Sequence, residues 1–181
     1  MIRLATGIAL LVLGLAMPAA AEVPEPSDYR QDNYKADVPA TLKGATVIGA
    51  KQLHEMMMRE AVVVIDVLPQ PPRPEGLPAT TLWHPPARED IPGSIWLANV
   101  GFGGLSTEMD AYFRKALERV SFAQTDRKLV FYCLEKCWMS WNAAKRALEY
   151  GYKAVYWFPG GTQDWIAAGY PTLLNAPVPV K

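Results

Sequence analysis

Two short runs of apolar residues constrain the fold of this chain more than any other feature. They are Ala61–Val67 (AVVVIDV) and Lys128–Cys133 (KLVFYC). Uninterrupted β-branched and aromatic runs of this length are typical of strands that are buried on both faces of a sheet. Other segments carry apolar residues at helical spacing, at Lys51–Glu60, Ser106–Val120 and Trp138–Tyr150. The sequence therefore predicts an α/β fold with a central, mostly parallel sheet and helices on both faces.

Shorter segments complete the predicted domain, which spans residues 46–172. We expect three further strands and a fourth helix, at Thr46–Ile48, Ile95–Leu97, Ala154–Phe158 and Thr162–Ala168. Residues 68–90 contain seven prolines, which exclude a helix or a central strand, so we expect a long Pro-rich insert in the form of a loop. Residues 22–45 are mostly polar and are predicted to be a mobile lead-in, and residues 173–181 an irregular tail.

The first 21 residues have the layout of a secretory signal peptide. Arg3 precedes an apolar run from Leu4 to Ala16, and the small residues Ala19–Ala21 precede Glu22. The run is shorter than the roughly 20 residues of a transmembrane helix, although an uncleaved membrane anchor stays open as an alternative. We expect a mature chain that begins near Glu22, has no membrane span and lies in the periplasm, where disulfides are tolerated.

Charge and cysteine content exclude several classes of protein. Basic and acidic residues number 18 each, and removal of residues 1–21 takes away only Arg3, which leaves 17 basic and 18 acidic residues. Because no basic excess or basic run exists, a nucleic-acid partner is not expected. Two cysteines are too few for a disulfide-dense scaffold. Their spacing also fits neither haem c attachment nor a zinc site, so no bound metal or other cofactor is expected.

The second apolar run ends in a loop that carries both cysteines. Cys133 closes the strand, Cys137 follows after three residues, and a helix begins at Trp138. Backbone N–H groups at a helix N-terminus favour an anion, and a thiolate is such an anion. We expect Cys133 to be the more reactive thiol and Cys137 the resolving thiol. The other residues predicted to form this anion-binding loop are Leu134, Glu135, Lys136, Trp138, Met139 and Ser140.

Asp66 ends the first apolar run in the same way. In parallel sheets covered by helices, active sites lie beyond the carboxyl ends of the strands. Both Asp66 and Cys133 stand at such ends, so we expect them at one edge of the sheet. There the Asp66 carboxylate could support the cysteine loop through backbone hydrogen bonds or could serve as a surface cap.

Three motifs in order resemble those of rhodanese-like domains, over about Thr46 to Thr172. They are the strand ending Ile65-Asp66-Val67, the stretch Ile91-Pro92-Gly93-Ser94-Ile95, and the stretch from Gly151 through Pro159-Gly160-Gly161-Thr162-Gln163-Asp164-Trp165 to Pro171. In that family the cysteine at the strand end takes up a sulfane sulfur as a persulfide. The resemblance therefore implies a rhodanese fold, with Cys133 as the persulfide site.

The chain departs from the family pattern at several positions. Leu68 stands where the family usually has the arginine of an Asp-Val-Arg motif, and the Pro-rich insert replaces a short acidic segment. Cys133 precedes Ser140 by seven residues, about one more than usual, and the loop contains no arginine. Related phosphatases need that arginine to clamp phosphate, and Met139 stands in its place, so phosphatase activity is not expected.

The stretch from Cys133 to Arg146 further resembles a narrower group of exported rhodanese-like proteins with a paired-cysteine-Trp motif. That group is associated with catabolism that depends on pyrroloquinoline quinone. The resemblance implies a role beside quinoprotein alcohol dehydrogenases and their cytochrome c acceptors, although no residue of this chain indicates quinone binding.

Three functions stay open from the sequence. The chain could transfer sulfane sulfur through a Cys133 persulfide, as a general periplasmic thiosulfate-type sulfurtransferase does. It could cycle Cys133 and Cys137 between dithiol and disulfide with a thiol substrate. It could also serve without catalysis, as an assembly or interaction module for a dehydrogenase that uses the Pro-rich insert and the many tryptophans.

Overall fold

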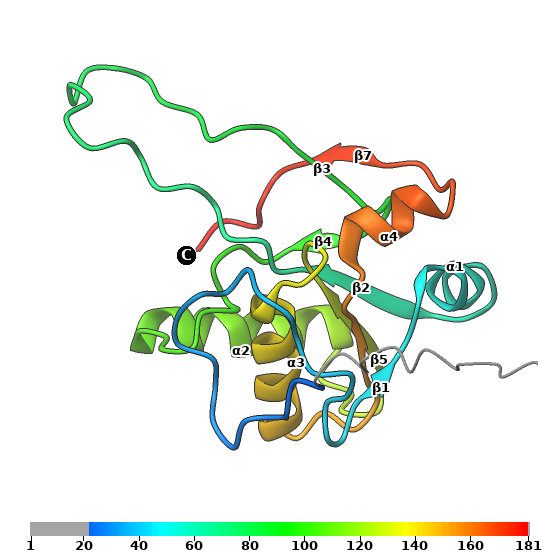
Figure 1. Cartoon of the computed structure of the whole chain (residues 1–181). Helices are drawn as coiled ribbons and strands as arrows, with labels where there is room; N and C mark the ends of the chain where they lie inside the picture. The colour runs from blue at the N-terminus through cyan, green and yellow to red at the C-terminus, as the bar shows by residue number, and fades with distance from the viewer. Residues whose placement is uncertain (1–21, 181) are drawn as a thin grey trace, which may run out of the picture.

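The computed structural model describes residues 22–180 and contains a five-stranded parallel sheet (Figure 1). The strand order is β1-β6-β5-β2-β4, and every paired neighbour runs parallel. The strands are β1 (Thr46–Val47), β6 (Val155–Phe158), β5 (Lys128–Tyr132), β2 (Val62–Asp66) and β4 (Ile95–Trp96). The two apolar runs form β2 and β5, which lie next to each other inside the sheet, as their composition requires.

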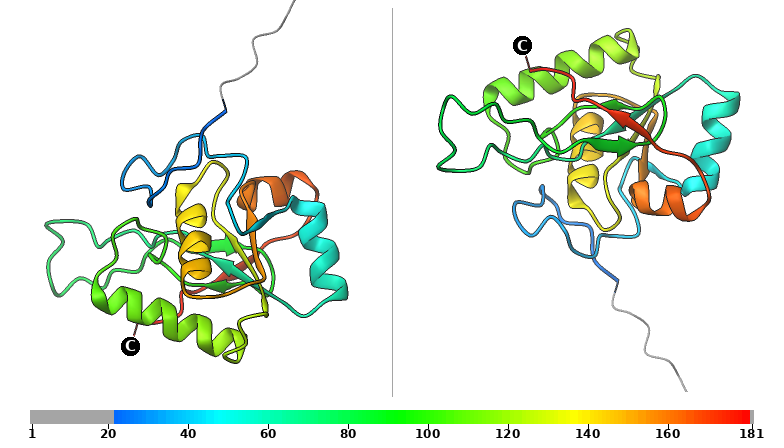
Figure 2. Two further views of the ribbon diagram at one scale, coloured as in Figure 1. Left: turned by 90° about the horizontal axis from the view of Figure 1, so that it is seen from below. Right: turned by 90° about the horizontal axis from the view of Figure 1, so that it is seen from above.

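Four helices cover the sheet, two on each face (Figure 2). They are α1 (Ala50–Arg59), α2 (Thr107–Ser121), α3 (Trp138–Glu149) and α4 (Gly161–Ala167). Alternate residues of β5 enter different cores: Phe131 packs with the apolar sides of α2 and α3, whereas Tyr132 packs with those of α1 and α4. The predicted α/β fold is thereby confirmed, and each predicted helix and strand exists within one or two residues of its expected bounds.

The segments predicted to lack secondary structure contain one additional pair of strands. β3 (Arg88–Asp90) at the end of the Pro-rich insert pairs antiparallel with β7 (Leu173–Asn175) in the tail. The prediction of an irregular tail is therefore wrong for these three residues. They were too few and too exposed to produce an apolar pattern. Residues 70–86 form no helix or strand and extend from the domain as a long loop (Figure 1).

Residues 22–45 form a strap across α3 and the cysteine loop rather than a mobile lead-in. The main chain of Arg30 makes two hydrogen bonds with the side chain of Asn142, and the Tyr34 hydroxyl accepts one from the N–H of Gly103. A side chain at Gly103 would collide with the strap, because a Cβ there would lie 2.3 Å from the Arg30 carbonyl oxygen. The prediction was wrong because the strap is held by backbone groups and single side chains, which leave no periodic signal in the sequence.

The predicted signal peptide, residues 1–21, lies outside the described residues and stays a prediction. Within residues 22–180, each helix is too short or too polar to cross a membrane.

Replacement of Asn142 by alanine should loosen the strap. Asn142 is fully buried and makes three hydrogen bonds, two to Arg30 and one to the Gly101 carbonyl. Each buried hydrogen bond contributes about 1 kcal/mol, so we expect the free energy of unfolding to fall by about 2–3 kcal/mol in urea. Lys128→Ala is the control outside the strap, because it removes an exposed ion pair with Glu60 and should cost less than about 1 kcal/mol. Equal losses for the two variants would contradict the role of the strap.

Candidate functional site

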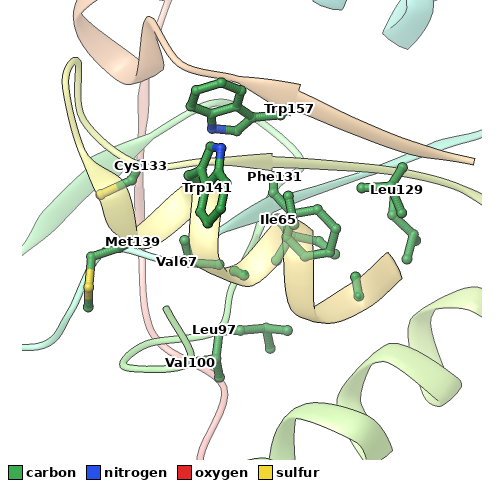
Figure 3. Close-up of a cluster of buried hydrophobic side chains, with 14 of the residues drawn as sticks. Ile65, Val67, Leu97, Val100, Leu129, Phe131, Cys133, Met139, Trp141 and Trp157 are labelled. Carbon is green, nitrogen blue, oxygen red and sulfur yellow. The ribbon is translucent and has the colours of Figure 1, made fainter. Parts of the chain in front are cut away.

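The site lies where β5 ends and α3 begins. Cys133 directly follows β5, and Cys137 is the residue that caps the N-terminus of α3. Both are free thiols, and both are buried: Cys133 is fully covered and Cys137 is 8% exposed. Cys133 faces the core beside α3, near Met139 and Trp141 (Figure 3). The sequence prediction that the loop closes onto a helix N-terminus is thus met by the geometry.

The loop turns sharply at Lys136, which has a left-handed backbone with φ of 55°. This conformation is uncommon for a residue with a side chain, and here neighbouring segments hold the loop on both sides. From the strap, the Ala36 N–H donates to the Lys136 carbonyl (3.1 Å), and the Tyr34 carbonyl accepts from the Trp138 N–H (2.8 Å). From α4, the Thr162 N–H donates to the Cys133 carbonyl (3.2 Å).

Side chains complete the support of the loop. The Gln163 Oε1 atom accepts a hydrogen bond from the Glu135 N–H (2.9 Å), and the indole of Trp138 donates to the Asp37 carbonyl (3.1 Å). The Ser140 hydroxyl donates to the Cys137 carbonyl (3.0 Å) and accepts from the indole of Trp157 (3.0 Å). The predicted loop residues are therefore together in space, but Trp138, Met139 and Ser140 are buried supports in the first turn of α3 rather than exposed binding groups.

The two thiols differ strongly in acidity. A hydrogen bond from the Cys133 thiol is the main cause that lowers the pKa of Cys137 to about 7. Burial opposes this shift, whereas the backbone N–H groups of Met139, Leu134 and Ser140 favour the thiolate. Burial, together with the same hydrogen bond to Cys137, raises the pKa of Cys133 well above its ordinary value. These shifts favour Cys137 as the thiolate of the pair, whereas the sequence led us to expect Cys133 to be the more reactive thiol, and which cysteine reacts first stays a prediction.

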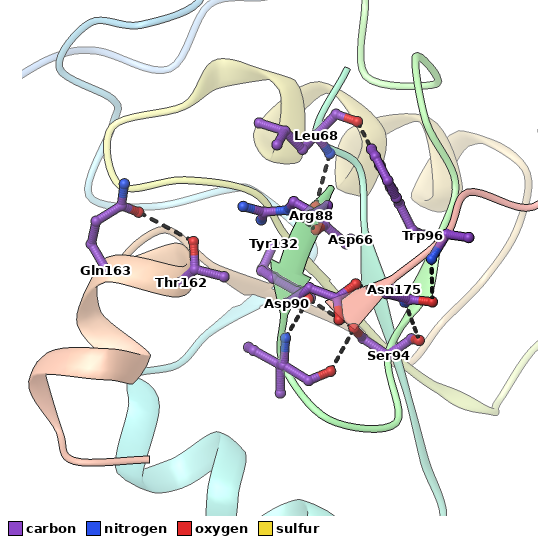
Figure 4. Close-up of polar contacts among 12 residues, drawn as sticks. Asp66, Leu68, Arg88, Asp90, Ser94, Trp96, Tyr132, Thr162, Gln163 and Asn175 are labelled. Atoms are coloured by element: carbon purple, nitrogen blue, oxygen red, sulfur yellow. Dashed lines mark hydrogen bonds and ion pairs between the residues drawn. The ribbon is translucent and has the colours of Figure 1, made fainter. Parts of the chain in front are cut away.

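Asp66 lies at the same sheet edge as Cys133, as predicted, because it is the register partner of Tyr132. Its carboxylate does not bond to the cysteine loop. One oxygen accepts from the Leu68 N–H (2.8 Å), and the other is paired with the Arg88 Nε atom (2.8 Å) (Figure 4). Burial raises the pKa of Asp66 to about 6, and the charge of Arg88 limits that rise.

Arg88 is the residue of this site that sequence reasoning missed. It belongs to β3, at the far end of the Pro-rich insert, 22 positions after the aspartate that it pairs with. The family pattern leads one to expect an arginine at position 68, where this chain has Leu68. The guanidinium of Arg88 places a cation beside Asp66 instead, from a position farther along the chain. The only available signal was the Arg-Glu-Asp sequence just before Ile91, and that signal is weak because the insert separates it from Asp66.

The described residues offer no evident metal site. Within residues 22–180, no three His, Cys, Asp or Glu side chains are grouped so that they could hold a metal ion. The groups that the structure does bring to this edge of the sheet are the two thiols, the loop N–H groups and the Asp66–Arg88 pair.

Comparison with known proteins places this site in a family. Residues 49–168 match the sequence model described as "Rhodanese-like domain", so the chain belongs to the rhodanese-like domain family. This membership makes it a domain of the sulfurtransferase type with a five-stranded parallel sheet. No curated protein matches the chain.

Solved structures share the fold at low sequence identity. YnjE is 18% identical with a TM-score of 0.50, and the match covers 75% of this chain and 32% of YnjE. The polysulfide-sulfur transferase homodimer of Wolinella succinogenes is 18% identical (TM-score 0.44, 72% of this chain and 79% of that chain). A rhodanese-related protein of Thermoplasma volcanium is 22% identical (TM-score 0.43, 72% and 99%).

Alkylation should distinguish the two thiols. Because the pKa of Cys137 is about 7 and that of Cys133 is raised, we expect iodoacetamide to label Cys137 first, with a rate that is half-maximal near pH 7. Cys133→Ala removes the thiol that donates to Cys137, so it should move this midpoint to higher pH. Peptide mapping by mass spectrometry measures both effects. First labelling of Cys133 at pH 7 would restore the sequence-based assignment.

Proposed function

We propose that this protein exchanges sulfane sulfur and disulfides through the Cys137–Cys133 pair, as an exported accessory protein of quinoprotein alcohol catabolism. The observation that supports the chemistry is the low pKa of the Cys137 thiol, which lies at the N-terminus of α3 and accepts a hydrogen bond from Cys133. The placement in alcohol catabolism rests on the resemblance of the stretch from Cys133 to Arg146 to the exported group associated with pyrroloquinoline quinone.

In the first step, the Cys137 thiolate attacks the outer sulfur of a sulfane donor such as thiosulfate. A bond forms between the Cys137 sulfur and this outer sulfur, and the bond that joined it to the donor breaks. The remainder of the donor leaves with the electron pair, as sulfite when thiosulfate is used. The product is a persulfide on Cys137, whose negative charge lies near the N-terminus of α3.

In the second step, the neighbouring Cys133 resolves the persulfide. The Cys133 sulfur attacks the Cys137 sulfur, the bond to the outer sulfur breaks, and hydrosulfide leaves with the proton of the Cys133 thiol. This step leaves a disulfide between Cys133 and Cys137. An external dithiol then restores both thiols by supplying two electrons and two protons, and is itself oxidised to a disulfide. A single-thiol sulfurtransferase would lack this second step.

A non-catalytic assembly module is the second candidate, and the insert favours it. Residues 70–86 extend from the domain, and Leu82 within them is 82% exposed. A groove between this loop and the start of α2 is lined by Trp83, Phe102 and Met109 among others. The partner in this case would be a quinoprotein dehydrogenase or its cytochrome c, met in the periplasm after removal of the predicted signal peptide.

Serine variants should trap different states of the cysteine pair. After incubation with thiosulfate or polysulfide, we expect Cys133→Ser to accumulate a persulfide on Cys137, because no thiol is left to expel it. Cys137→Ser should form at least tenfold less persulfide, and wild type should form the disulfide. Intact-mass and peptide mass spectrometry measure the three states. Robust sulfur transfer from thiosulfate to cyanide that is lost only in Cys133→Ser would instead identify a thiosulfate-type sulfurtransferase acting through Cys133.

Growth on alcohols should test the biological role. We expect both serine variants to slow growth on an alcohol that is oxidised by a quinoprotein dehydrogenase, and to leave growth on succinate unchanged. Replacement of residues 70–86 by a short Gly-Ser linker is the matched variant, because it preserves Arg88 and all five strands of the sheet. Normal growth of both serine variants, together with loss of growth in the linker variant, would favour the assembly module.

A further inference from the structure

The guanidinium of Arg88 carries N–H groups that the structure leaves unused, and those on one of its nitrogens are buried. Its Nε atom is paired with Asp66, but the Nη2 atom is buried and has no hydrogen-bond partner among the described residues. The Arg88 side chain is only 11% exposed, so solvent does not readily satisfy this donor. Buried donors are almost always hydrogen-bonded, and an exception of this kind needs an explanation.

The position of Arg88 indicates what this donor faces. Asp66 is the register partner of Tyr132, and Cys133 is the next residue along the chain. Arg88 therefore lies at the edge of the sheet where the cysteine loop begins. Figure 4 shows its guanidinium on the side of Asp66 that faces Thr162 and Gln163, the residues that hold the cysteine loop.

Negative charges around Cys133 oppose the loss of its thiol proton, so a nearby cation would stabilise the anionic sulfur. The Asp66 carboxylate and an ionised Cys137 both oppose a negative charge on Cys133. Asp90 lies near Asp66 and Arg88, and its carboxylate adds to the negative charge at this edge, whereas burial raises the pKa of Tyr132 and keeps that phenol protonated. Arg88 is a cation near enough for its charge to interact with that of a Cys133 thiolate.

We propose that Arg88 is a positioning residue whose unused Nη2–H group stabilises the sulfur anion that develops on Cys133 during sulfur exchange. The proposal deepens the function proposed above and rests on it. In the resolving step, the Cys133 sulfur must give up its proton as it attacks the persulfide, and Arg88 offsets the negative charge of Asp66 at that moment. The end of the Pro-rich insert, strand β3, thus contributes the positive charge of Arg88 to the site.

The test measures the alkylation of Cys133 alone, in the Cys137→Ser background, between pH 7 and pH 10. We expect Arg88→Gln to slow alkylation about tenfold at pH 8 and to move its midpoint to higher pH. Arg88→Lys keeps the charge and should recover part of the rate. Arg73→Gln is the matched control, because Arg73 bonds only to carbonyl groups within the insert and should leave the rate unchanged.

A second pair of variants keeps the test decisive if Arg88→Gln does not fold, since that variant leaves the buried Asp66 without its partner. Asp66→Asn removes the opposing carboxylate and should speed the alkylation of Cys133. The double variant that combines Asp66→Asn with Arg88→Gln should be alkylated at Cys133 about tenfold more slowly than Asp66→Asn alone. Equal alkylation profiles with and without Arg88, in either background, would overturn the proposal.

The outcome is separable from that of the proposed function. If Arg88→Gln slows the alkylation of Cys133 but wild type forms neither persulfide nor disulfide, the proposed sulfur exchange is refuted. The electrostatic role of Arg88 then still holds. Persulfide and disulfide formation that is unaffected by Arg88→Gln would remove only the role of Arg88.

Discussion

The acidity of the Cys137 thiol depends on a sharp turn between a buried strand and a helix. In a parallel sheet, the carboxyl end of β5 and the N-terminus of α3 lie at the same edge, and Cys133–Cys137 alone must connect them. The turn is possible because Lys136 adopts a left-handed backbone and because the strap and α4 bind the carbonyl and N–H groups that the turn leaves unpaired. The N–H groups at the start of α3 thereby lie where they favour the thiolate of Cys137.

A pair of buried thiols behaves differently from a single one. Burial alone would raise both pKa values, because it removes water from the charged form. The hydrogen bond between the two sulfurs breaks this symmetry: it favours the anion on Cys137 and the protonated thiol on Cys133. In the exchange proposed above, Cys137 is therefore the thiol that attacks, and Cys133 retains a proton for the leaving sulfur.

The fold could be predicted from the sequence to the extent that burial leaves a local pattern. The runs that form β2 and β5 have that pattern, and the three family motifs fix the cysteine at a strand end. The strap has none, because it is held by main-chain hydrogen bonds of Tyr34 and Ala36 and by isolated side chains such as that of Tyr34, which do not recur at a regular spacing. A usable hint lay in Trp138, since a buried indole N–H needs an acceptor, and here the acceptor is the Asp37 carbonyl in the strap.

Arg88 was not predictable for a related reason, and its position has a physical consequence. An arginine two residues after Asp66 would be fixed by the strand itself, whereas Arg88 is held by β3 and by the pairing of β3 with β7. The Asp66 carboxylate is fully buried, and a buried charge is stable only while it is paired. Under the proposal above, any contact that displaces the end of the insert would therefore change the charge beside Cys133, which would couple the exposed loop of residues 70–86 to a fully buried thiol.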